Sequence, residues 1–381
     1  MHWKKRDTRV LSKRPEFFLA AVILCWPLLA HAVDLDSLKV APGFTLEVFA
    51  EGVENARQMA MTDKGSLLVG SRQAGNLYAL PDRDHDYRAD SVITLASGLR
   101  RPSGIALKGG DLYVADINLI LKFPDIENHV QPRAPFEVVY DKFPSDGSHG
   151  WKYLRVAPDG TLTVPVGAPC NICDPKLPYA AIHSLNLETG KRTLIARGIR
   201  NSVGFDYHPV TGELWFTDNG RDMLGNEIPP EELNRVRKPG LHFGYPYIHA
   251  GTIPDPQFGK GKKVTDFEPP VFTMPAHHAA LGMTFIRQTV WPKKYHHAVV
   301  MAEHGSWNRD PASGYRVMAV LLDESGKPVG YEPLVEGWLE QGWLGSNVSG
   351  RPADVLELSD GSLLIADDKG GVIYRLRYTG E

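Results

Sequence analysis

The sequence has no overall excess of positive charge. Its 381 residues include 42 Lys and Arg against 45 Asp and Glu, which gives a formal net charge of −3 at pH 7. Proteins that bind DNA or RNA concentrate basic side chains on one face or along one helix. The charge balance therefore argues against nucleic acid as a partner.

The chain also lacks a hydrophobic run long enough to span a membrane. Its longest run, Phe17 to Leu29, falls short of the about 18 residues that a spanning helix needs. Several Lys and Arg precede this run, and the small residues Ala30 and Ala32 follow it. This order is typical of a secretory signal peptide. We expect residues 1–32 to be removed on export to a bacterial periplasm, and the mature chain not to span a membrane.

Cysteine is scarce, and only Cys170 and Cys173 remain after residue 32. A c-type haem on this pair would require His at the position of Asp174. Zinc is disfavoured because no second pair of Cys or His follows at the spacing of a zinc finger. In an oxidising compartment a disulfide between Cys170 and Cys173 is the leading interpretation, and a free dithiol is the alternative.

Six short hairpin patterns are what the sequence does contain. In each, an apolar run with β-forming residues meets a turn such as Asp-Gly or Gly-Gly, and a second apolar run follows. The six segments are 59–71, 104–116, 154–166, 203–218, 283–305 and 355–367. Hairpins repeated at the intervals between these segments are typical of the blades of a β-propeller, which bury their faces by stacking around an axis. The pattern predicts an all-β, six-bladed β-propeller that forms a single domain over residues 33–381.

Polar clusters lie beside these hairpins, where a propeller places its ligand. His149 stands on a Gly-flanked turn before the third hairpin and is either a base or a solvated loop residue. Arg200 and Asn201 enter the fourth repeat, and Arg351 enters the sixth. Two guanidinium groups from different blades suit an anionic ligand, although surface ion pairs would explain them too.

Two further clusters are candidates for a metal. Turn carbonyls at Gly220 and Arg221, with Glu232 nearby, are oxygen ligands of the kind Ca²⁺ prefers, and a solvated acidic loop is the alternative. His277 and His278 are adjacent, so at most one of them faces the channel. The segment 82–86 carries three Asp residues but lacks the Gly and the closing Glu of an EF-hand, so we interpret it as a polar turn, and a structural ion site is the alternative.

Together these motifs resemble the soluble quinoprotein glucose dehydrogenase and sorbosone dehydrogenase family. The resemblance covers roughly residues 40–378. It rests on the order of the segments 149–160, 200–204, 218–220, 232–234 and 351–354, and the segments 281–285 and 304–309 are similar to the sorbosone dehydrogenase branch. Members of this family are exported six-bladed propellers that use pyrroloquinoline quinone (PQQ) and Ca²⁺.

The resemblance assigns roles to individual residues. It implies His149 as the general base and Arg200, Asn201 and Arg351 as the clamp on the PQQ carboxylates. It implies the carbonyls of Gly220 and Arg221 as ligands of Ca²⁺. We expect Glu232 to assist at the metal, and we expect His278 and either Arg309 or Asn308 to be further cofactor contacts.

The expected activity is oxidation of an aldose or related aldehyde, with hydride passing to PQQ. No haem motif and no Gly-rich nucleotide-binding turn is present, so electrons must pass to an external quinone, small cytochrome or dye. A non-catalytic propeller that binds PQQ, sugar or protein is the alternative, because a fold does not dictate a function. A calcium-dependent lactonase-like hydrolase fits the arginine pair and His149 poorly.

Overall fold

The computed structural model describes residues 34–342 and 345–380. The predicted signal peptide 1–32 lies outside these residues. From Leu35 onward the chain forms one compact unit, which is nearly all β-structure. Within the described residues, no helix is both long enough and apolar enough to cross a bilayer.

Six large sheets form the blades, and the first three follow one another along the chain. Blade 1 contains β3 (Ala56–Met61), β4 (Ser66–Ser71), β5 (Leu77–Pro81) and β6 (Ile93–Ala96). Blade 2 contains β7 (Gly104–Lys108), β8 (Asp111–Asp116), β9 (Leu119–Phe123) and β10 (Glu137–Tyr140). Blade 3 contains β11 (Arg155–Val156), β12 (Leu162–Val166), β13 (Ala181–Leu185), β14 (Arg192–Arg197) and, parallel to β14, β18 (Leu241–His242).

The last three blades complete the ring. Blade 4 contains β15 (Phe205–Tyr207), β16 (Leu214–Asp218), β17 (Glu231–Arg235) and β21 (Phe272–Met274). Blade 5 contains β22 (Ala280–Phe285), β23 (Val299–Glu303), β24 (Arg316–Leu322), β25 (Pro328–Glu336) and β1 (Lys39–Val40). Blade 6 contains β28 (Pro352–Glu357), β29 (Leu363–Asp367), β30 (Val372–Tyr378) and β2 (Phe44–Glu51).

The remaining elements are small. Two hairpins are formed by β19 (Ile248–His249) with β20 (Ile253–Pro254) and by β26 (Leu339–Gly342) with β27 (Gly345–Val348). The described residues also form four short 3₁₀ helices, which are η1 (Leu35–Ser37), η2 (Ile126–Asn128), η3 (Val264–Asp266) and η4 (Lys293–Tyr295).

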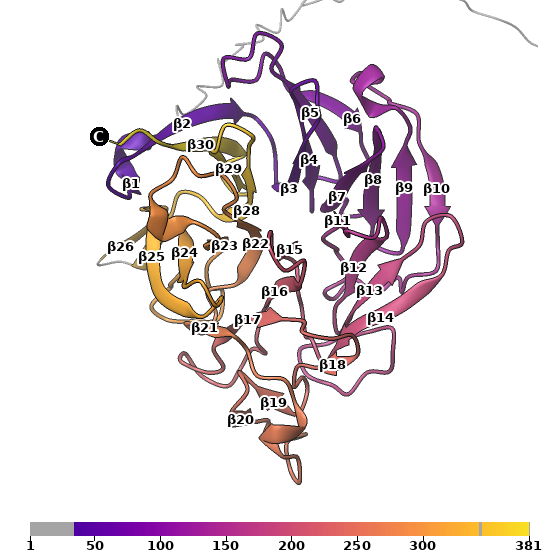
Figure 1. Ribbon diagram of the computed structural model, residues 1–381, viewed down its shortest axis with the longest axis vertical. Helices are drawn as coiled ribbons and strands as arrows, with labels where there is room; N and C mark the ends of the chain where they lie inside the picture. The colour runs from indigo at the N-terminus through magenta and orange to yellow at the C-terminus, as the bar shows by residue number, and fades with distance from the viewer. Residues whose placement is uncertain (1–33, 343–344, 381) are drawn as a thin grey trace, which may run out of the picture. The chain divides into compact units, whose positions relative to one another are not determined.

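The predicted six-bladed propeller is confirmed. Each of the six predicted hairpins is the first pair of strands in one blade, and the first strands lie innermost around the axis (Figure 1). The tight turns depend on residues that accept a left-handed backbone, such as Gly65 at φ +86° and Gly361 at φ +83°. Apolar clusters between neighbouring blades form the core, and one of them joins Leu67 and Val69 of blade 1 to Leu364 and Ile373 of blade 6.

The ring is closed by a strand from the beginning of the unit. The strand β2 pairs with β30 along its whole length, so blade 6 combines both ends of the described chain. The first two strands of every blade are antiparallel, so the start of the first strand lies beside the end of the second. The segments around them therefore meet at one mouth of the central channel, and these segments carry the polar clusters.

Candidate active site

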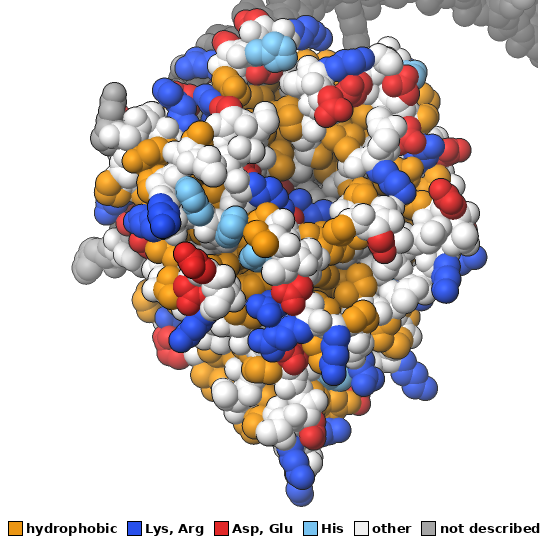
Figure 2. Space-filling view, viewed as in Figure 1, with side chains coloured by type: hydrophobic (Ala, Val, Ile, Leu, Met, Phe, Trp, Pro, Cys, Tyr) orange, Lys and Arg blue, Asp and Glu red, His pale blue; other side chains and the backbone are white. Residues whose placement is uncertain are grey.

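A cavity of about 300 Å³ lies at this mouth of the channel. Figure 2 shows a hollow near the middle of the face with Lys and Arg side chains inside it. The charged and aromatic side chains that line the cavity are Arg57, Arg72, Arg200, Arg351, Asp222, Glu231, His149, His277, His304, Trp151 and Trp307. They come from blades 1, 3, 4, 5 and 6 or from the loops that enter them, so the cavity exists only in the closed ring.

The side chain of His149 is fixed by a contact between one of its ring nitrogens and the backbone. Its backbone is left-handed, with φ +46°. A Cβ on Gly167 would lie 2.6 Å from the His149 Cβ, so glycine is required beside it. The Nδ1 atom lies 2.8 Å from the carbonyl oxygen of Ala168. Because a carbonyl only accepts hydrogen bonds, Nδ1 donates, and in the neutral ring Nε2 keeps its lone pair.

The surroundings of His149 favour this neutral form. Burial and the positive charge of Arg200 lower the pKa of His149 to about 4, although the hydrogen bond to Ala168 opposes the shift. The imidazole is therefore unprotonated at neutral pH. An unprotonated Nε2 beside a cavity is the arrangement that a general base needs.

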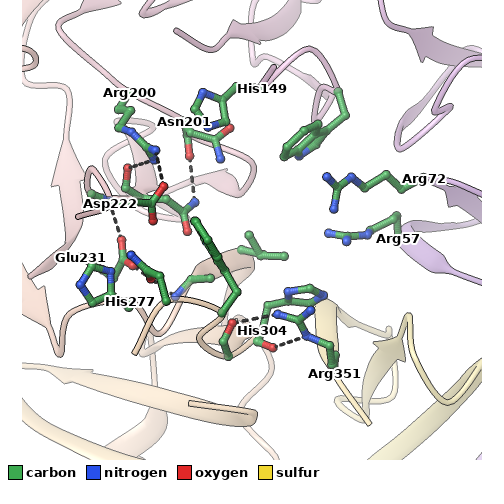
Figure 3. A pocket seen from close by; sticks show the side chains of 18 residues that line it. Arg57, Arg72, His149, Arg200, Asn201, Asp222, Glu231, His277, His304 and Arg351 are labelled. Carbon is green, nitrogen blue, oxygen red and sulfur yellow. Dashed lines mark hydrogen bonds and ion pairs between the residues drawn. The ribbon is translucent and has the colours of Figure 1, made fainter. Parts of the chain in front are cut away.

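Arg200 and Asn201 are fixed through their backbone. The carboxylate of Asp218, the last residue of β16, accepts the N–H groups of Arg200 at 2.8 Å and Asn201 at 2.6 Å. The Arg200 guanidinium donates to the carbonyl and side-chain oxygens of Asn171 at 2.9 and 2.8 Å, and it pairs with Asp222 at 3.0 Å. Arg200 and Asn201 both line the cavity, as predicted from the sequence, and the Arg200 side chain is held by its contacts with Asn171 and Asp222 (Figure 3).

A disulfide supports the Asn171 contact. The structure joins Cys170 to Cys173, and Asn171 lies inside the short loop that this bond closes. The backbone N–H of Cys173 donates to the Tyr245 hydroxyl at 3.1 Å, which anchors the loop further. The disulfide loop thus positions Asn171, and Asn171 positions Arg200.

Arg351 is arranged in the same way as Arg200. The carboxylate of Asp367, the last residue of β29, accepts the Arg351 backbone N–H at 2.7 Å. The guanidinium donates to the carbonyl oxygens of His304 at 3.0 Å and Gly305 at 2.8 Å. An Asp at the end of the second strand therefore fixes an Arg at the entry of the first strand in both blade 4 and blade 6.

A buried group of three polar side chains lies next to Arg351. Asp368 pairs with Arg57 at 2.5 Å and with the Nε2 atom of His304 at 2.9 Å. Burial alone would raise the pKa of Asp368, but Arg57 and His304 hold it well below its usual range. Asp368 therefore stays ionised and orients both partners towards the cavity.

The cavity has more positive charge than its carboxylates can balance. The Nε atoms of Arg57 and Arg72 are buried and have no hydrogen-bond partner among the described residues. Burial raises the pKa of Glu231 to about 8, so this carboxyl is largely neutral at pH 7. A buried guanidinium nitrogen without a partner is costly, and an anionic ligand would supply the missing acceptors.

The predicted metal ligands divide between two environments. Gly220 lines the cavity, and its N–H donates to Glu231 at 2.7 Å. Arg221 follows it and pairs with Asp255 at 2.6 Å. Glu232 is not part of the cavity lining, because neighbouring strand residues face opposite sides and it accepts the Ala250 N–H at 2.7 Å instead. The carboxylate at the cavity is that of Glu231.

Two other predicted residues also lie outside the lining. His278 contacts Glu303 at 2.9 Å and Ser313 at 2.7 Å, while its neighbour His277 lines the cavity. Arg309 pairs with Glu227 at 2.7 Å, whereas Asn308, the alternative to Arg309, lines the cavity.

Comparison with known proteins gives the family. The TrAA12-like family model matches residues 38–378. The chain belongs to the TrAA12-like family. An uncharacterized protein of Borreliella burgdorferi is 32% identical over 355 residues, which cover 90% of this chain and 91% of that protein. A pyrroloquinoline quinone-dependent sugar dehydrogenase of Hypocrea jecorina is 24% identical over 244 residues, or 55% of this chain and 56% of that one.

Solved structures of similar proteins share the fold. The PQQ domain of pyranose dehydrogenase from Coprinopsis cinerea superposes with a TM-score of 0.73 at 18% identity, covering 89% of this chain and 97% of that domain. The aldose sugar dehydrogenase of Streptomyces coelicolor, in its PQQ-bound form, gives 0.61 at 18% identity, covering 89% and 99%. These likenesses show that the chain shares the propeller fold of PQQ-dependent sugar dehydrogenases, and the expected membership of the sorbosone branch is not confirmed.

Several residues of this TrAA12-like site were missed by the sequence interpretation. Arg72 and Asp368 each directly follow the second strand of a hairpin, as Asn219 does in blade 4 and as His304, which begins the segment 304–309 identified from the sequence, does in blade 5. Aligning the six hairpins on this position would have identified them. Arg57 lies inside β3 and carries no such signal, because its partner Asp368 is distant in the sequence.

Proposed function

We propose that this TrAA12-like protein is an oxidoreductase that oxidises a sugar or related aldehyde with PQQ and Ca²⁺. The observation that carries the proposal is a neutral His149 whose Nε2 is left free beside a cavity lined by four arginines. Its relatives and structural neighbours include sugar dehydrogenases and a PQQ-bound form, which supports the same chemistry.

The residues present fit PQQ. This cofactor carries three carboxylates, and the cavity offers arginines from three directions. Arg200, Asn201 and Arg351 would hold the carboxylates, which matches their assignment from sequence. When bound, PQQ supplies the ortho-quinone that accepts a hydride from the substrate.

The residues around Gly220 fit a cation. Gly220 and Glu231 both line the cavity, and the Glu231 carboxyl lies close to Gly220, since it accepts the Gly220 N–H at 2.7 Å. We propose that the carbonyls of Gly220 and Arg221, with Glu231 in place of Glu232, would hold Ca²⁺ by oxygen coordination.

The role of His149 follows from its tautomer. With Nδ1 donating to Ala168, Nε2 accepts the proton from the substrate hydroxyl as hydride leaves the same carbon. The ring cannot rotate freely, since that hydrogen bond and the close approach of Gly167 fix it. General base catalysis of this kind contributes about 10² to 10⁴ in rate.

The setting of the activity is also a proposal. We infer export to the periplasm with cleavage after Ala32, and electron transfer to an external quinone, small cytochrome or dye. N-terminal sequencing of the exported protein should begin at Val33, and a mature chain that keeps residues 1–32 would contradict export by cleavage.

Reconstitution tests the proposed function. The exported protein, stripped with a chelator and dialysed, should reduce an artificial electron acceptor with sugars only after PQQ and Ca²⁺ are both restored. Each component alone is the control. Equal activity in the stripped protein would contradict the quinoprotein mechanism, and tight PQQ binding without turnover on any sugar would favour a binding protein.

A further inference from the structure

A second cavity of about 370 Å³ opens beside the central one and shares Arg72 with it. Arg72, Arg100 and Arg101 line this second cavity together with Gln73 and Gly147. We call these three arginines the basic entrance. The residues come from blade 1 and from the loop that enters blade 2, so the basic entrance lies at the mouth of the channel.

Arg72 has no carboxylate partner within the described part of the chain. Its guanidinium lies 3.9 Å from the centre of the Trp151 ring, and its Nε is buried without an acceptor. Burial lowers the pKa of Arg72, and the positive charges of Arg57, Arg101 and Arg351 lower it further, to about 10. Arg72 therefore still carries its charge at pH 7. The acidic neighbour Asp368 is already paired with Arg57 and His304.

Arg101 points towards the same region. It has a left-handed backbone, with φ +60°, a conformation that costs about 1 kcal/mol or more for a residue with a side chain. Its Nη1 donates to the carbonyl of Gly147 at 2.7 Å, and its guanidinium lies 5.8 Å from the Trp151 ring. Arg72 and Arg101 thus both contact Trp151, and neither is neutralised by a carboxylate in the described residues.

The basic entrance lies close to the proposed base. The Trp151 ring, which Arg72 covers, lies 5.9 Å from the His149 ring, and Arg72 is near enough to His149 to lower its pKa. In Figure 3, Arg57 and Arg72 lie on the side of the cavity opposite Arg200 and Asn201. A sugar whose reacting hydroxyl meets His149 would place a substituent at its other end near Arg72 and Arg101.

We propose that the substrate is an anionic sugar, with a carboxylate or phosphate that Arg72 and Arg101 bind while its reacting hydroxyl meets His149. The inference rests on the proposed function. Guanidinium groups recognise both oxyanions through paired hydrogen bonds. A neutral sugar would leave the buried Nε of Arg72 without an acceptor, so the basic entrance discriminates in favour of the anion.

Matched substrate pairs test the inference in protein reconstituted with PQQ and Ca²⁺. The pairs are glucose with glucuronate, galactose with galacturonate, and glucose with glucose 6-phosphate, and the last pair separates phosphate from carboxylate recognition. We expect kcat/KM for at least one anionic sugar to exceed that of its neutral partner by about tenfold or more. The preference should fall with added NaCl, because salt screens exposed charges.

Arginine variants locate the effect. Arg72→Gln and Arg101→Gln should each raise KM for the anionic sugar and bring the anionic-to-neutral ratio towards one. Arg101 is only partly buried, so its variant should fold even if Arg72→Gln does not. Arg88→Gln, an exposed arginine outside both cavities, is the matched control and should keep the preference.

The outcomes separate the two proposals. Equal or better oxidation of neutral sugars would overturn the proposal of an anionic substrate without contradicting the proposed dehydrogenase activity. If the arginine variants instead weaken PQQ binding and keep the anionic-to-neutral ratio of kcat/KM, the basic entrance binds the cofactor and the inference is overturned. If no sugar is oxidised, the proposed function fails, and the anion site is then tested by calorimetric titration of the PQQ-loaded protein with glucuronate and galacturonate. Binding by the wild-type protein that is lost in Arg101→Gln would support an anion site at Arg72 and Arg101. No binding by the wild-type protein would refute that site.

Discussion

Single carboxylates at the ends of strands organise the site at the scale of residues. Asp218 and Asp367 each accept backbone N–H groups and so aim Arg200 and Arg351 from two blades. Asp368 orients Arg57 and His304 from its own strand end. The functional side chains are therefore held before any ligand arrives, which lowers the entropic cost of binding.

The neutral state of His149 predicts an unusual pH profile. An ordinary histidine base would lose activity as pH falls through about 6.5. Burial and Arg200 lower the pKa of His149 to about 4. The acid limb of kcat/KM, which reports the free enzyme, should therefore lie clearly below pH 6.5, with activity lost as the base is protonated. Initial rates across pH 4–8 check this, and a limb at or above pH 6.5 would show a solvated histidine or a different base.

At the scale of elements, the loop closed by the Cys170–Cys173 disulfide connects an oxidation state of the chain to cofactor binding, because it positions Asn171 and, through Asn171, Arg200. Replacing Cys170 and Cys173 with Ser should loosen Asn171 and release Arg200 from two of its hydrogen bonds. We expect the Kd for PQQ to rise by about tenfold, with a smaller effect on thermal stability because the loop is short. Titration of the apoprotein with PQQ measures this.

Wild-type protein treated with a reductant is the control for the serine variant and should behave in the same way. Alkylation of the unreduced, unfolded protein reports the bond itself. Full labelling of both cysteines would contradict the disulfide, and unchanged PQQ affinity in the variant would show that the loop does not position Arg200.

The elements were more predictable than the contacts between them. Hairpins are local, and turns such as Asp360-Gly361 mark them in the sequence, so all six strand pairs could be predicted. The side of a strand on which a residue lies depends on register, which is why Glu232 and His278 were chosen where Glu231 and His277 line the cavity. The pairing of Arg57 with Asp368 spans almost the whole chain and arises only when the ring closes.

Ring closure governs the stability of the whole molecule. The strand β2 completes blade 6, and its Phe49 packs in the cluster that joins blades 6 and 1. Phe49→Ala should lower the free energy of unfolding by about 3–5 kcal/mol, since the ring is fully buried. Phe136→Ala, at a phenylalanine that is 48% exposed, should cost about 1 kcal/mol or less. Urea unfolding compares the two, and equal costs would show that the β2 closure contributes little.

The same closure brings the base, the arginines and the proposed cofactor site together, so the proposed catalysis depends on the assembled cavity. The most direct test of this catalysis is the single-turnover reduction of bound PQQ by sugar, followed by absorbance in wild-type protein and in His149→Ala. His85→Ala, at an exposed histidine outside the central cavity, is the matched control. We expect His149→Ala to bind PQQ with nearly unchanged affinity and to slow the reduction by at least about 10²-fold. Reduction at the wild-type rate in His149→Ala would show that His149 is not the base.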